Sequence, residues 1–552
     1  MSEPRFSVVT PVYETPPDVL AAMLDSVCRQ SFADWELCLV DDCSPDPELF
    51  DELQRAAAAD PRIRIERRAE NGGIVAASND AVAMARGEFI ALLDHDDALH
   101  PDALAIVQEA LVGSPDADYV YTDEDKIDRA GHHSGPFFKP DWSPERLRTQ
   151  MYTCHLSVLR RALVEAVGGF DPEFEGSQDW DLILRVTERA RDVLHVPRVL
   201  YQWRTLETST AGGGEAAKPW AFEAGTRAIQ AHCERIGLAA RAERDLDSPG
   251  VYHLRPALRA EPLVSIVIPT AGLTREVRFE EVTLISHCVR SIVADSTYTN
   301  YEIVPVVDPA TDRGLLAELA EIAGERLRPV VFEGEFNFSA KVNLGVAHGH
   351  GEIVVLLNDD IEVDTPDWIE RLVMYAEHPE IGAVGGRLRL QDGRLQHVGV
   401  RFEHGLPGHP YYSFSHDFSG YSNSVLVAQD CLAVTGACLA SRRDAFEAVG
   451  GLTETFPLNY NDVDYCLKLR DHGLRTVYDP DLEMTHFESS SRSMAVEKWE
   501  EGEIRAKWLR YTAVDPYSNP NLRREIPRLT SPFAWALRRP LAGRRRRPRA
   551  RR

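Results

Sequence analysis

The chain has 552 residues, of which 44% are hydrophobic and 27% are charged, and its formal net charge at pH 7 is -26. This composition is typical of globular proteins and excludes collagen-like, intrinsically disordered and disulfide-scaffold classes. The length predicts several domains, and because an acidic body repels nucleic acid phosphates, we expect no nucleic-acid partner.

Cysteine usage and the N-terminal sequence point to one compartment. The nine cysteines include no CxxC pair, which is typical of scattered thiols in a reducing environment. The first residues lack the basic-then-apolar pattern of a signal peptide, and no stretch reaches the roughly 18 apolar residues of a membrane-spanning helix. We therefore expect a cytoplasmic location.

In chain order, the first half alternates short strands with helices. Residues 6–12, 35–42 and 88–93 have the apolar, β-rich composition of buried strands, whereas residues 17–29, 49–59 and 102–112 have helical patterns. The alternation predicts an α/β fold with a mostly parallel sheet, in which ligands bind at the carboxyl ends of the strands.

The second half repeats this series. Val264-Ser-Ile-Val-Ile-Pro corresponds to Phe6-Ser-Val-Val-Thr-Pro, and a Val-Gly-Gly unit closes each series at Val167 and Val449. The step from Asp42 to Asp94 is 52 residues and that from Asp308 to Asn358 is 50, while the onward steps to the Val-Gly-Gly units are 73 and 91 residues. The sequence therefore predicts a duplicated domain with an insertion in the second copy.

This repeat sets the expected organisation. We place the first domain at residues 1–210, a helical linker at 211–260, the second domain at 261–512 and a C-terminal extension at 513–552. The linker contains a Gly-rich run and an amphipathic helical stretch at residues 220–236.

Acidic clusters follow a predicted strand in each copy. Asp94-His95-Asp96-Asp97 recurs as Asn358-Asp359-Asp360. Converging carboxylates suit Mg²⁺ or Mn²⁺ with a substrate phosphate, although a solvated turn is the alternative. No GxGxxG or GxxxxGK[ST] motif occurs, and Asn71-Gly72-Gly73 is interpreted as a tight turn, so a diphosphate would be held through the metal. Tyr121-Thr-Asp-Glu-Asp-Lys adds more acid, or is an exposed charged loop.

A second polar group recurs after each Val-Gly-Gly unit. Asp179 and Asp181 precede one helical stretch, and Asp462 and Asp464 precede its counterpart. One member of each pair can cap the helix, which leaves the other to serve as a general base. His486 follows a late strand of the second copy and is either a structural residue or a metal ligand, whereas the first copy has Tyr201-Gln-Trp-Arg there, so the two metal sites should differ.

Together these residues resemble, twice over, the inverting GT-A glycosyltransferases of family 2, over about residues 4–210 and 261–512. The resemblance rests on the ordered set Thr10-Pro-Val-Tyr, Asp41-Asp42, Leu-Leu-Asp-His-Asp-Asp and Gln178-Asp179. The second copy, with Leu-Leu-Asn-Asp-Asp, Asn461-Asp462, His486 and the later Asp515-Pro-Tyr-Ser-Asn-Pro-Asn, is similar to tandem enzymes that build bacterial O-antigen and rhamnan-type polysaccharides.

The resemblance implies two GT-A domains, a UDP- or dTDP-sugar donor, a glycan or lipid-linked glycan acceptor and a Mn²⁺ or Mg²⁺ cofactor. It assigns the bases to Asp179 and Asp462, although Gln178 and Asn461 replace the family's preceding Glu. The implied nucleotide-sugar contacts are Pro11, Tyr13, Glu14, Asp42, Asp94, Pro269, Thr270, Asp308 and Asn358. The implied metal ligands are Asp94, Asp96, Asp97, Asp359, Asp360 and His486.

The C-terminal tail carries nine arginines within residues 538–552, beside an apolar segment that starts at Pro532. Such a pair of features favours an anionic membrane surface as a partner, and a basic end without a partner is the alternative. We therefore expect a bifunctional glycosyltransferase at the inner face of the membrane. The alternatives are one active domain beside a degenerate acceptor-binding domain, a non-catalytic glycan-binding scaffold, or a nucleotidylyltransferase, for which the Gly-rich basic loop after the first strand is missing.

Overall fold

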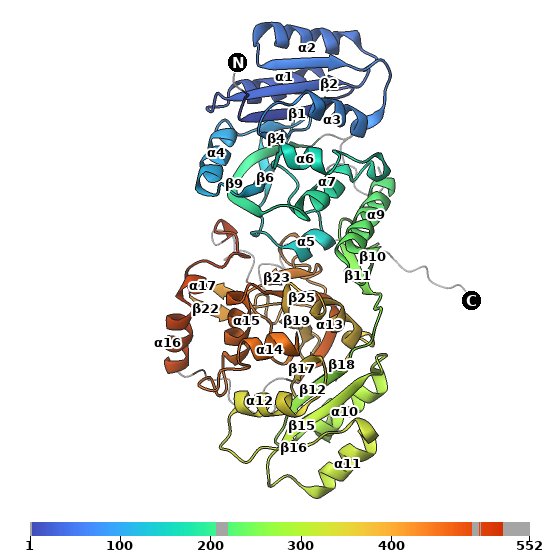
Figure 1. Ribbon diagram of the computed structural model, residues 1–552, viewed down its shortest axis with the longest axis vertical. Coiled ribbons are helices and arrows are strands. Elements are labelled where there is room, and N and C mark those ends of the chain that lie inside the picture. The colour runs from blue at the N-terminus through green and yellow to red at the C-terminus, as the bar shows by residue number, and fades with distance from the viewer. Residues whose placement is uncertain (1–2, 206–218, 404, 488–495, 497, 523–552) are drawn as a thin grey trace, which may run out of the picture.

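A computed structural model of the chain describes residues 3–205, 219–403, 405–487, 496 and 498–522. The molecule is elongated, with one large sheet in each half (Figure 1). The halves meet in the middle of the molecule, where α5 (Pro144–Thr149) of the first half contacts β23 (Gln429–Cys431) of the second. None of the helices in these residues is both long and apolar enough to cross a membrane. The arginine-rich tail lies outside the described residues.

The first sheet has the strand order β3-β2-β1-β4-β8-β6-β9-β5, with β7 paired to β6. β1 to β4 are parallel to one another, and β8 then runs antiparallel to β4. The strands are β1 (Phe6–Val12), β2 (Trp35–Asp41), β3 (Ile63–Arg67), β4 (Phe89–Leu92), β5 (Ala98–Leu99), β6 (Ala117–Ile127), β7 (His133–Phe137), β8 (Ser157–Arg160) and β9 (Asp192–Arg204).

Helices connect these strands close to the predicted positions. Pro at the first helical position starts both α1 and α2, and the side chain of Asp46 accepts the amide of Glu48 as a cap for α2. The helices are α1 (Pro17–Cys28), α2 (Pro47–Ala59), α3 (Gly73–Met84), α4 (Ala103–Gly113), α5 (Pro144–Thr149), α6 (Arg161–Ala166) and α7 (Gln178–Thr187).

The second sheet has the order β16-β15-β12-β17-β24-β19-β25-β18, which matches the first sheet strand for strand. The parallel part of the sheet and its switch to an antiparallel strand are also shared. The strands are β12 (Val264–Pro269), β15 (Tyr301–Val307), β16 (Val330–Val331), β17 (Ile353–Leu357), β18 (Ile361–Val363), β19 (Ile381–Arg389), β24 (Cys438–Arg442) and β25 (Arg475–His486). The duplicated α/β fold with two mixed, mostly parallel sheets is thereby confirmed.

The second half also contains strands outside this shared order. β20 (Leu395–His397), β21 (Arg401–Glu403), β22 (Leu406–Gly408) and β23 (Gln429–Cys431) belong to the inserted residues, and β13 (Thr274–Val277) and β14 (Glu280–Thr283) form a hairpin. The helices are α10 (Leu284–Asp295), α11 (Arg313–Ala323), α12 (Phe338–His348), α13 (Trp368–Ala376), α14 (Arg443–Ala448), α15 (Asn461–Asp471), α16 (Lys498–Lys507) and α17 (Leu509–Ala513).

The segment between the sheets is packed against both halves. α9 (Pro219–Ile236) lies on α7, and β11 (Tyr252–Pro256), which pairs with β10 (Ala240–Arg244), contacts α13. The Trp180 and Tyr252 rings meet edge to face at 5.0 Å, and one cluster of buried apolar side chains runs from the first sheet through this segment into the second half. A helix is therefore present where the sequence predicted one, at residues 220–236.

The two halves also meet through buried charge at α5 and β23. Glu145 of α5 is fully buried and pairs with Arg148 and, at 3.1 Å, with Arg475 of the second half. Arg475 pairs in turn with Asp430 at 2.5 Å, and Ser143 donates to the same Asp430 carboxylate at 2.8 Å. Burial opposes the charge on Glu145, but the two guanidinium groups lower its pKa below the ordinary value.

Candidate functional site

In both halves the predicted nucleotide-binding residues follow strands that end at the same edge of the sheet. Val12 lies opposite Asp41 in the β1–β2 pair. Tyr13 and Glu14, which follow β1, therefore lie near Asp42, which follows β2. In the second half Pro269 lies opposite Val306, which brings Thr270 beside Asp308. Pro11 is half-buried, and Tyr13 and Glu14 are exposed.

The two aspartates at this edge are held differently. The Asp42 carboxylate accepts hydrogen bonds from the backbone amides of Gly72 and Gly73 at 2.9 and 2.8 Å. These amides belong to the N-terminus of α3, which begins at Gly73, and not to the tight turn expected at Asn71-Gly72-Gly73. Asp308 instead pairs with the buried ammonium of Lys341 at 2.6 Å, and that group also donates to the Thr270 carbonyl at 3.2 Å. Thr270 Oγ1 donates to Asp359 at 2.6 Å, which ties Asp359 to the predicted nucleotide side.

A cluster of possible metal ligands lies next to this edge in the first half. Ligand atoms of Asp94, Asp97 and His155 all lie within 4.8 Å of one another. Asp97 is fully buried and accepts hydrogen bonds from the Tyr201 hydroxyl and the Arg204 amide, both at 2.6 Å. Burial and the neighbouring Asp94 raise the pKa of Asp97 well above its ordinary value, which is the situation a bound cation relieves.

Asp96 lies beside this cluster and is not one of its three members. Its carbonyl accepts a hydrogen bond from Arg204 Nε at 2.8 Å, and its side chain is half-buried. Burial is the main cause that raises the pKa of Asp96 above the ordinary value. It stays a predicted metal ligand.

His155 was missed from the sequence because it comes from the loop before β8. Its ring stacks on Tyr201 with 4.5 Å between centroids, and Nε2 lies 3.7 Å from Asp94 while Nδ1 lies 3.6 Å from Glu124. Burial opposes a positive charge, but Glu124 and the site carboxylates raise the pKa of His155 to about 9. Two carboxylates and an imidazole are a donor set that fits Mn²⁺ or another divalent ion.

In the second half the structure brings Asp360 and His486 together, with Nε2 of the imidazole 3.0 Å from the Asp360 carboxylate. Gln396 Oε1 accepts from His486 Nδ1 at 2.9 Å, so in the neutral ring Nε2 carries a lone pair. A lone pair facing a carboxylate is stabilised by a proton or by a divalent cation between them, and these donors therefore fit a metal ion. Asn358 lies at the same point, with Nδ2 3.3 Å from Nε2.

The two predicted bases lie at helix starts that border the pockets. Asp179 is in the first turn of α7 and lines a pocket of about 90 Å³ with Asp94 and His155. Burial raises the pKa of Asp179 above its ordinary value, which makes the carboxylate a better proton acceptor. Asp462 is in the first turn of α15, and its carboxylate accepts the amides of Gly436 at 2.9 Å and Val463 at 2.8 Å.

The alternative aspartates have structural partners. Asp181 is fully buried and pairs with Arg185, which also donates to the carbonyls that follow α6. Asp464 is fully buried and accepts hydrogen bonds from Thr453 and Trp508 at 2.5 and 2.9 Å. The first aspartate of each pair lines one of the two pockets at these sites, and the second lines neither of the two.

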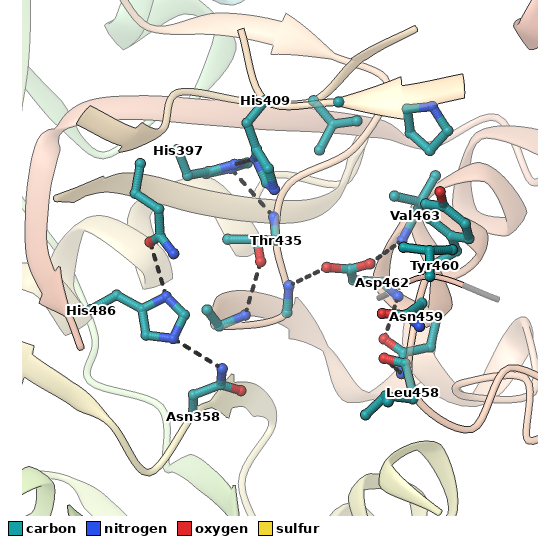
Figure 2. Close-up of a pocket in the computed structure, with 18 of the residues that line it drawn as sticks. Asn358, His397, His409, Thr435, Leu458, Asn459, Tyr460, Asp462, Val463 and His486 are labelled. Atoms are coloured by element: carbon teal, nitrogen blue, oxygen red, sulfur yellow. Dashed lines mark hydrogen bonds between the residues drawn. The ribbon is translucent and has the colours of Figure 1, made fainter. Parts of the chain in front are cut away.

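The insertion makes the second pocket larger, at about 410 Å³. Gln396, His397, His409 and Tyr412 from the inserted residues line it together with Asp360 and Asp462. Figure 2 shows His486 and Asp462 on opposite sides of this pocket. His397 Nδ1 lies 2.9 Å from His409 Nδ1, and burial followed by the nearby His409 lowers the pKa of His397 well below its ordinary value, so this ring is neutral.

β25 ends at His486, and the matching position of β9 is Trp203, since Thr485 and Gln202 face equivalent residues of β18 and β5. The first half therefore has no histidine at this position, as the sequence indicated. However, the first site gains His155 from a different element. The interpretation of residues 121–126 as an exposed loop is wrong, because they lie in β6, where Asp123 and Glu124 are buried against cationic partners.

The chain matches known families along most of its length. Residues 7–168 match the family described as glycosyl transferase family 2, and residues 262–500 match that described as glycosyltransferase like family 2. Together these matches cover more than half of the chain, and they coincide with the two sheets.

Individual relatives extend across both halves. An uncharacterized protein, y4gI, of Sinorhizobium fredii is 40% identical over 535 residues, covering 95% of this chain and 58% of the relative. The O-antigen biosynthesis protein RfbC of Myxococcus xanthus is 36% identical over 529 residues, covering 94% of this chain and 40% of the relative. This chain thus spans about half the length of these relatives.

A solved structure of S. aureus TarS, residues 1–349, is 20% identical, with a TM-score of 0.34, covering 41% of this chain and 65% of that one. The two family matches, one on each sheet, settle the family. The chain belongs to glycosyltransferase family 2, and it carries two tandem domains of that family.

Proposed function

We propose that each domain transfers a sugar from a nucleotide-diphosphate donor, a UDP- or dTDP-sugar, to a growing bacterial cell-surface polysaccharide. The observation that carries the proposal is the recurrence of one arrangement in both domains: a nucleotide-side aspartate, a carboxylate–histidine pair, and an aspartate at a helix start on the same pocket. The name of the Myxococcus relative, an O-antigen biosynthesis protein, supports a surface polysaccharide as the product.

The reaction would be a single inverting displacement. The acceptor hydroxyl oxygen bonds to the anomeric carbon while the bond to the diphosphate breaks, and the bonding electrons leave with the diphosphate. Asp179 or Asp462 takes the hydroxyl proton, which contributes typically about 10²- to 10⁴-fold in rate. Holding both substrates in one pocket supplies the alignment that the displacement needs.

Asp94, Asp97 and His155 would hold the divalent ion in the first domain, and Asp360 and His486 would hold it in the second. Asp96 and Asp359 are proposed as additional ligands. A bound divalent ion neutralises the charge that develops on the departing diphosphate. Asn358 lacks the charge of Asp94, and His486 compensates as a ligand from β25.

The proposed location is the inner face of the cell membrane. The arginine run at residues 538–552 supports it, because each basic residue near an anionic lipid surface contributes about 1 kcal/mol. A lipid-linked glycan acceptor would then be presented at the same surface.

The test is release of free nucleoside diphosphate from a panel of UDP- and dTDP-sugars with Mn²⁺ or Mg²⁺. The wild type is compared with Asp96→Ala and Asp360→Ala, and we expect each variant to lose part of the metal-dependent turnover. If no donor is turned over, even with lipid-linked acceptor extracts present, the enzymatic proposal fails and glycan binding becomes the function to test.

A further inference from the structure

The first site is connected to the second domain through β6. Consecutive residues of this strand, Asp123 and Glu124, are both buried, and the pairing of β6 with β9 is irregular at this point. Glu124 accepts the backbone amide of His155 at 3.1 Å and lies beside its imidazole. Asp123 faces the second domain instead. Adjacent positions of one strand therefore contact the site and the domain interface.

Lys139 links these two carboxylates. Its backbone amide donates to Asp123 at 2.9 Å, while its fully buried ammonium donates to Glu124 at 2.9 Å. The same ammonium donates to the carbonyls of Thr153 and His155, both at 2.6 Å. Lys139 thus fixes the position of the loop that places His155 in the site.

The start of the C-terminal extension packs on the second domain, where Asp515 accepts the Phe402 amide at 2.8 Å and Tyr517 accepts a hydrogen bond from Arg470 at 2.9 Å, and it is therefore counted with that domain. This segment completes the arrangement with Asn519, which is 2% exposed. Its side-chain amide donates to both carboxylate oxygens of Asp123, at 3.0 and 2.9 Å, and to the Lys139 carbonyl at 2.8 Å. The amide is oriented by Asn521, whose backbone N–H donates to Asn519 Oδ1 at 2.9 Å. Asn519 therefore contacts both Lys139 and the Asp123 carboxylate, which also accepts a hydrogen bond from the Lys139 amide.

Two further contacts from the second domain hold the same loop. The Asp141 amide donates to the Pro516 carbonyl at 2.9 Å. The Tyr421 hydroxyl accepts the Phe138 amide at 2.9 Å and donates to the Pro136 carbonyl at 2.8 Å. The loop around Lys139 is thus fixed on both sides by residues of the other domain.

We propose that Asn519 is a positioning residue for the first-domain site, so that this site is complete only when the second domain is docked. The proposal rests on the proposed function for the identity of the site, and on the hydrogen-bonded series Asn519, Lys139, Glu124 and His155 for its mechanism. Loss of the Asn519 amide removes a donor from the buried Asp123 carboxylate and from the Lys139 carbonyl. The loop then relaxes, and His155 loses its orientation toward Asp94.

The test measures Mn²⁺ affinity, with Mn²⁺ alone as the probe and no nucleotide sugar. The full-length chain carries Asp360→Ala, which leaves only the first-domain site. Outer-shell substitutions typically weaken metal binding about 10- to 100-fold, so we expect Asn519→Ala to weaken it about tenfold. Asn521→Ala is the matched control, since this side chain lies in the same segment but donates to Pro197 at 2.9 Å, away from Lys139.

A reciprocal exchange separates positioning from general loosening. Asn519→Asp alone places a second carboxylate against Asp123 and should weaken Mn²⁺ binding at least as much as alanine does. Combining it with Asp123→Asn restores one donor and one acceptor across the contact, and we expect at least part of the affinity to return. An Asn519→Ala protein in the Asp94→Ala background should keep the second-domain affinity unchanged.

Amide hydrogen exchange gives a readout that does not depend on metal. Asn519→Ala should speed exchange in residues 153–156, whereas Asn521→Ala should not, and residues 395–399 of the second site should be unaffected by either. If the parent chain bound no Mn²⁺ at the first site, the metal part of the proposed function would fail, and exchange would still decide the positioning role. Equal effects of the two substitutions, no effect of either, or no rescue by the exchange would overturn the proposal.

Discussion

The two domains share a scaffold but differ in the residues that fill it. In the first, Ser7 accepts the Gly87 amide and donates to Glu36, and in the second Ser265 does the same with Gly351 and Glu302. A Cβ on either glycine would meet the serine backbone nitrogen at 2.6 or 2.4 Å, so both positions need glycine. These contacts fix the start of the strand that leads to each acidic cluster.

The site residues have diverged on that scaffold. The histidine comes from the loop before β8 in the first domain and from the end of β25 in the second. Backbone amides of Gly72 and Gly73 at the N-terminus of α3 hold Asp42, whereas a lysine of α12 holds Asp308. The comparison teaches that packing preserves the strand order after duplication, while side chains of the same chemistry can reach equivalent places from different elements.

The largest expected effect comes from removing Glu145, whose buried ion pair with Arg475 connects the two domains. Glu145→Ala leaves Arg148 beside Arg475 without the carboxylate between them, in a place where Glu145 is fully buried. Removing one partner of a buried ion pair costs about 3–5 kcal/mol, and thermal unfolding measures it. The control is Glu165→Ala, which breaks an exposed pair with Arg161 and should cost under about 1 kcal/mol. Equal losses would mean that the buried pair does not stabilise the interface.

The next prediction tests whether the two sites bind Mn²⁺ independently of each other. Gln396→Leu removes the group that fixes the His486 tautomer, and no equivalent residue was inserted in the first domain. We expect Mn²⁺ affinity at the second site to fall about 10- to 100-fold, with the first site as an internal control. A metal titration followed by electron paramagnetic resonance measures both sites. Equal weakening of both would contradict the separate assignment.

A smaller effect is expected at an asparagine that makes the same backbone hydrogen bonds in both domains. Asn79 accepts the Phe170 amide at 2.9 Å and donates to its carbonyl at 2.8 Å, and Asn343 makes the same pair of bonds with Leu452 at 2.8 and 2.9 Å. Asn79→Ala and Asn343→Ala should each cost about 1–3 kcal/mol in the free energy of unfolding, since they leave two backbone groups without a partner. Denaturant unfolding that shows a loss for one variant alone would mean that the shared contact is not equivalent in the two domains.

The smallest effect is a pH dependence at the interface. His195 lies between Asp123 and Asp141, with 2.9 Å from a ring nitrogen to each carboxylate. Burial opposes its charge, but the two carboxylates raise the pKa of His195 above the ordinary value of 6.5. Its stabilising contribution is therefore complete below about pH 6.5 and is lost as pH rises through the higher folded value. The difference in melting temperature between wild type and His195→Gln should shrink above neutral pH, and a constant difference would contradict this assignment.

Much of this structure was predictable from the sequence, and the rest depended on long-range contacts. The strand ends at Asp42, Asp94 and Asn358 follow from local apolar patterns. The same pattern occurs in both copies, which strengthens the assignment of these strands. His155 and Lys341 lie in a loop and on a helix, and neither has a local pattern that marks it as part of a site. The spacing difference of 91 against 73 residues did signal the insertion that supplies Gln396 and enlarges the second pocket.

Burial of charge was the hardest feature to predict. A strand with three consecutive acids suggests an exposed loop, because a carboxylate is normally solvated. Asp123 and Glu124 are buried since Lys139, His195 and Asn519 supply charge and hydrogen bonds from distant parts of the chain. Only the tertiary structure brings these partners together.

The most direct test of two separate transferase sites is product analysis with radiolabelled donors for Asp179→Asn, Asp462→Asn and the double variant. We predict that each single variant loses one transfer, by about 10²- to 10⁴-fold, and retains the other, while the double variant loses both. Complete loss of both transfers in either single variant, with the fold intact, would contradict the assignment of one independent base to each domain.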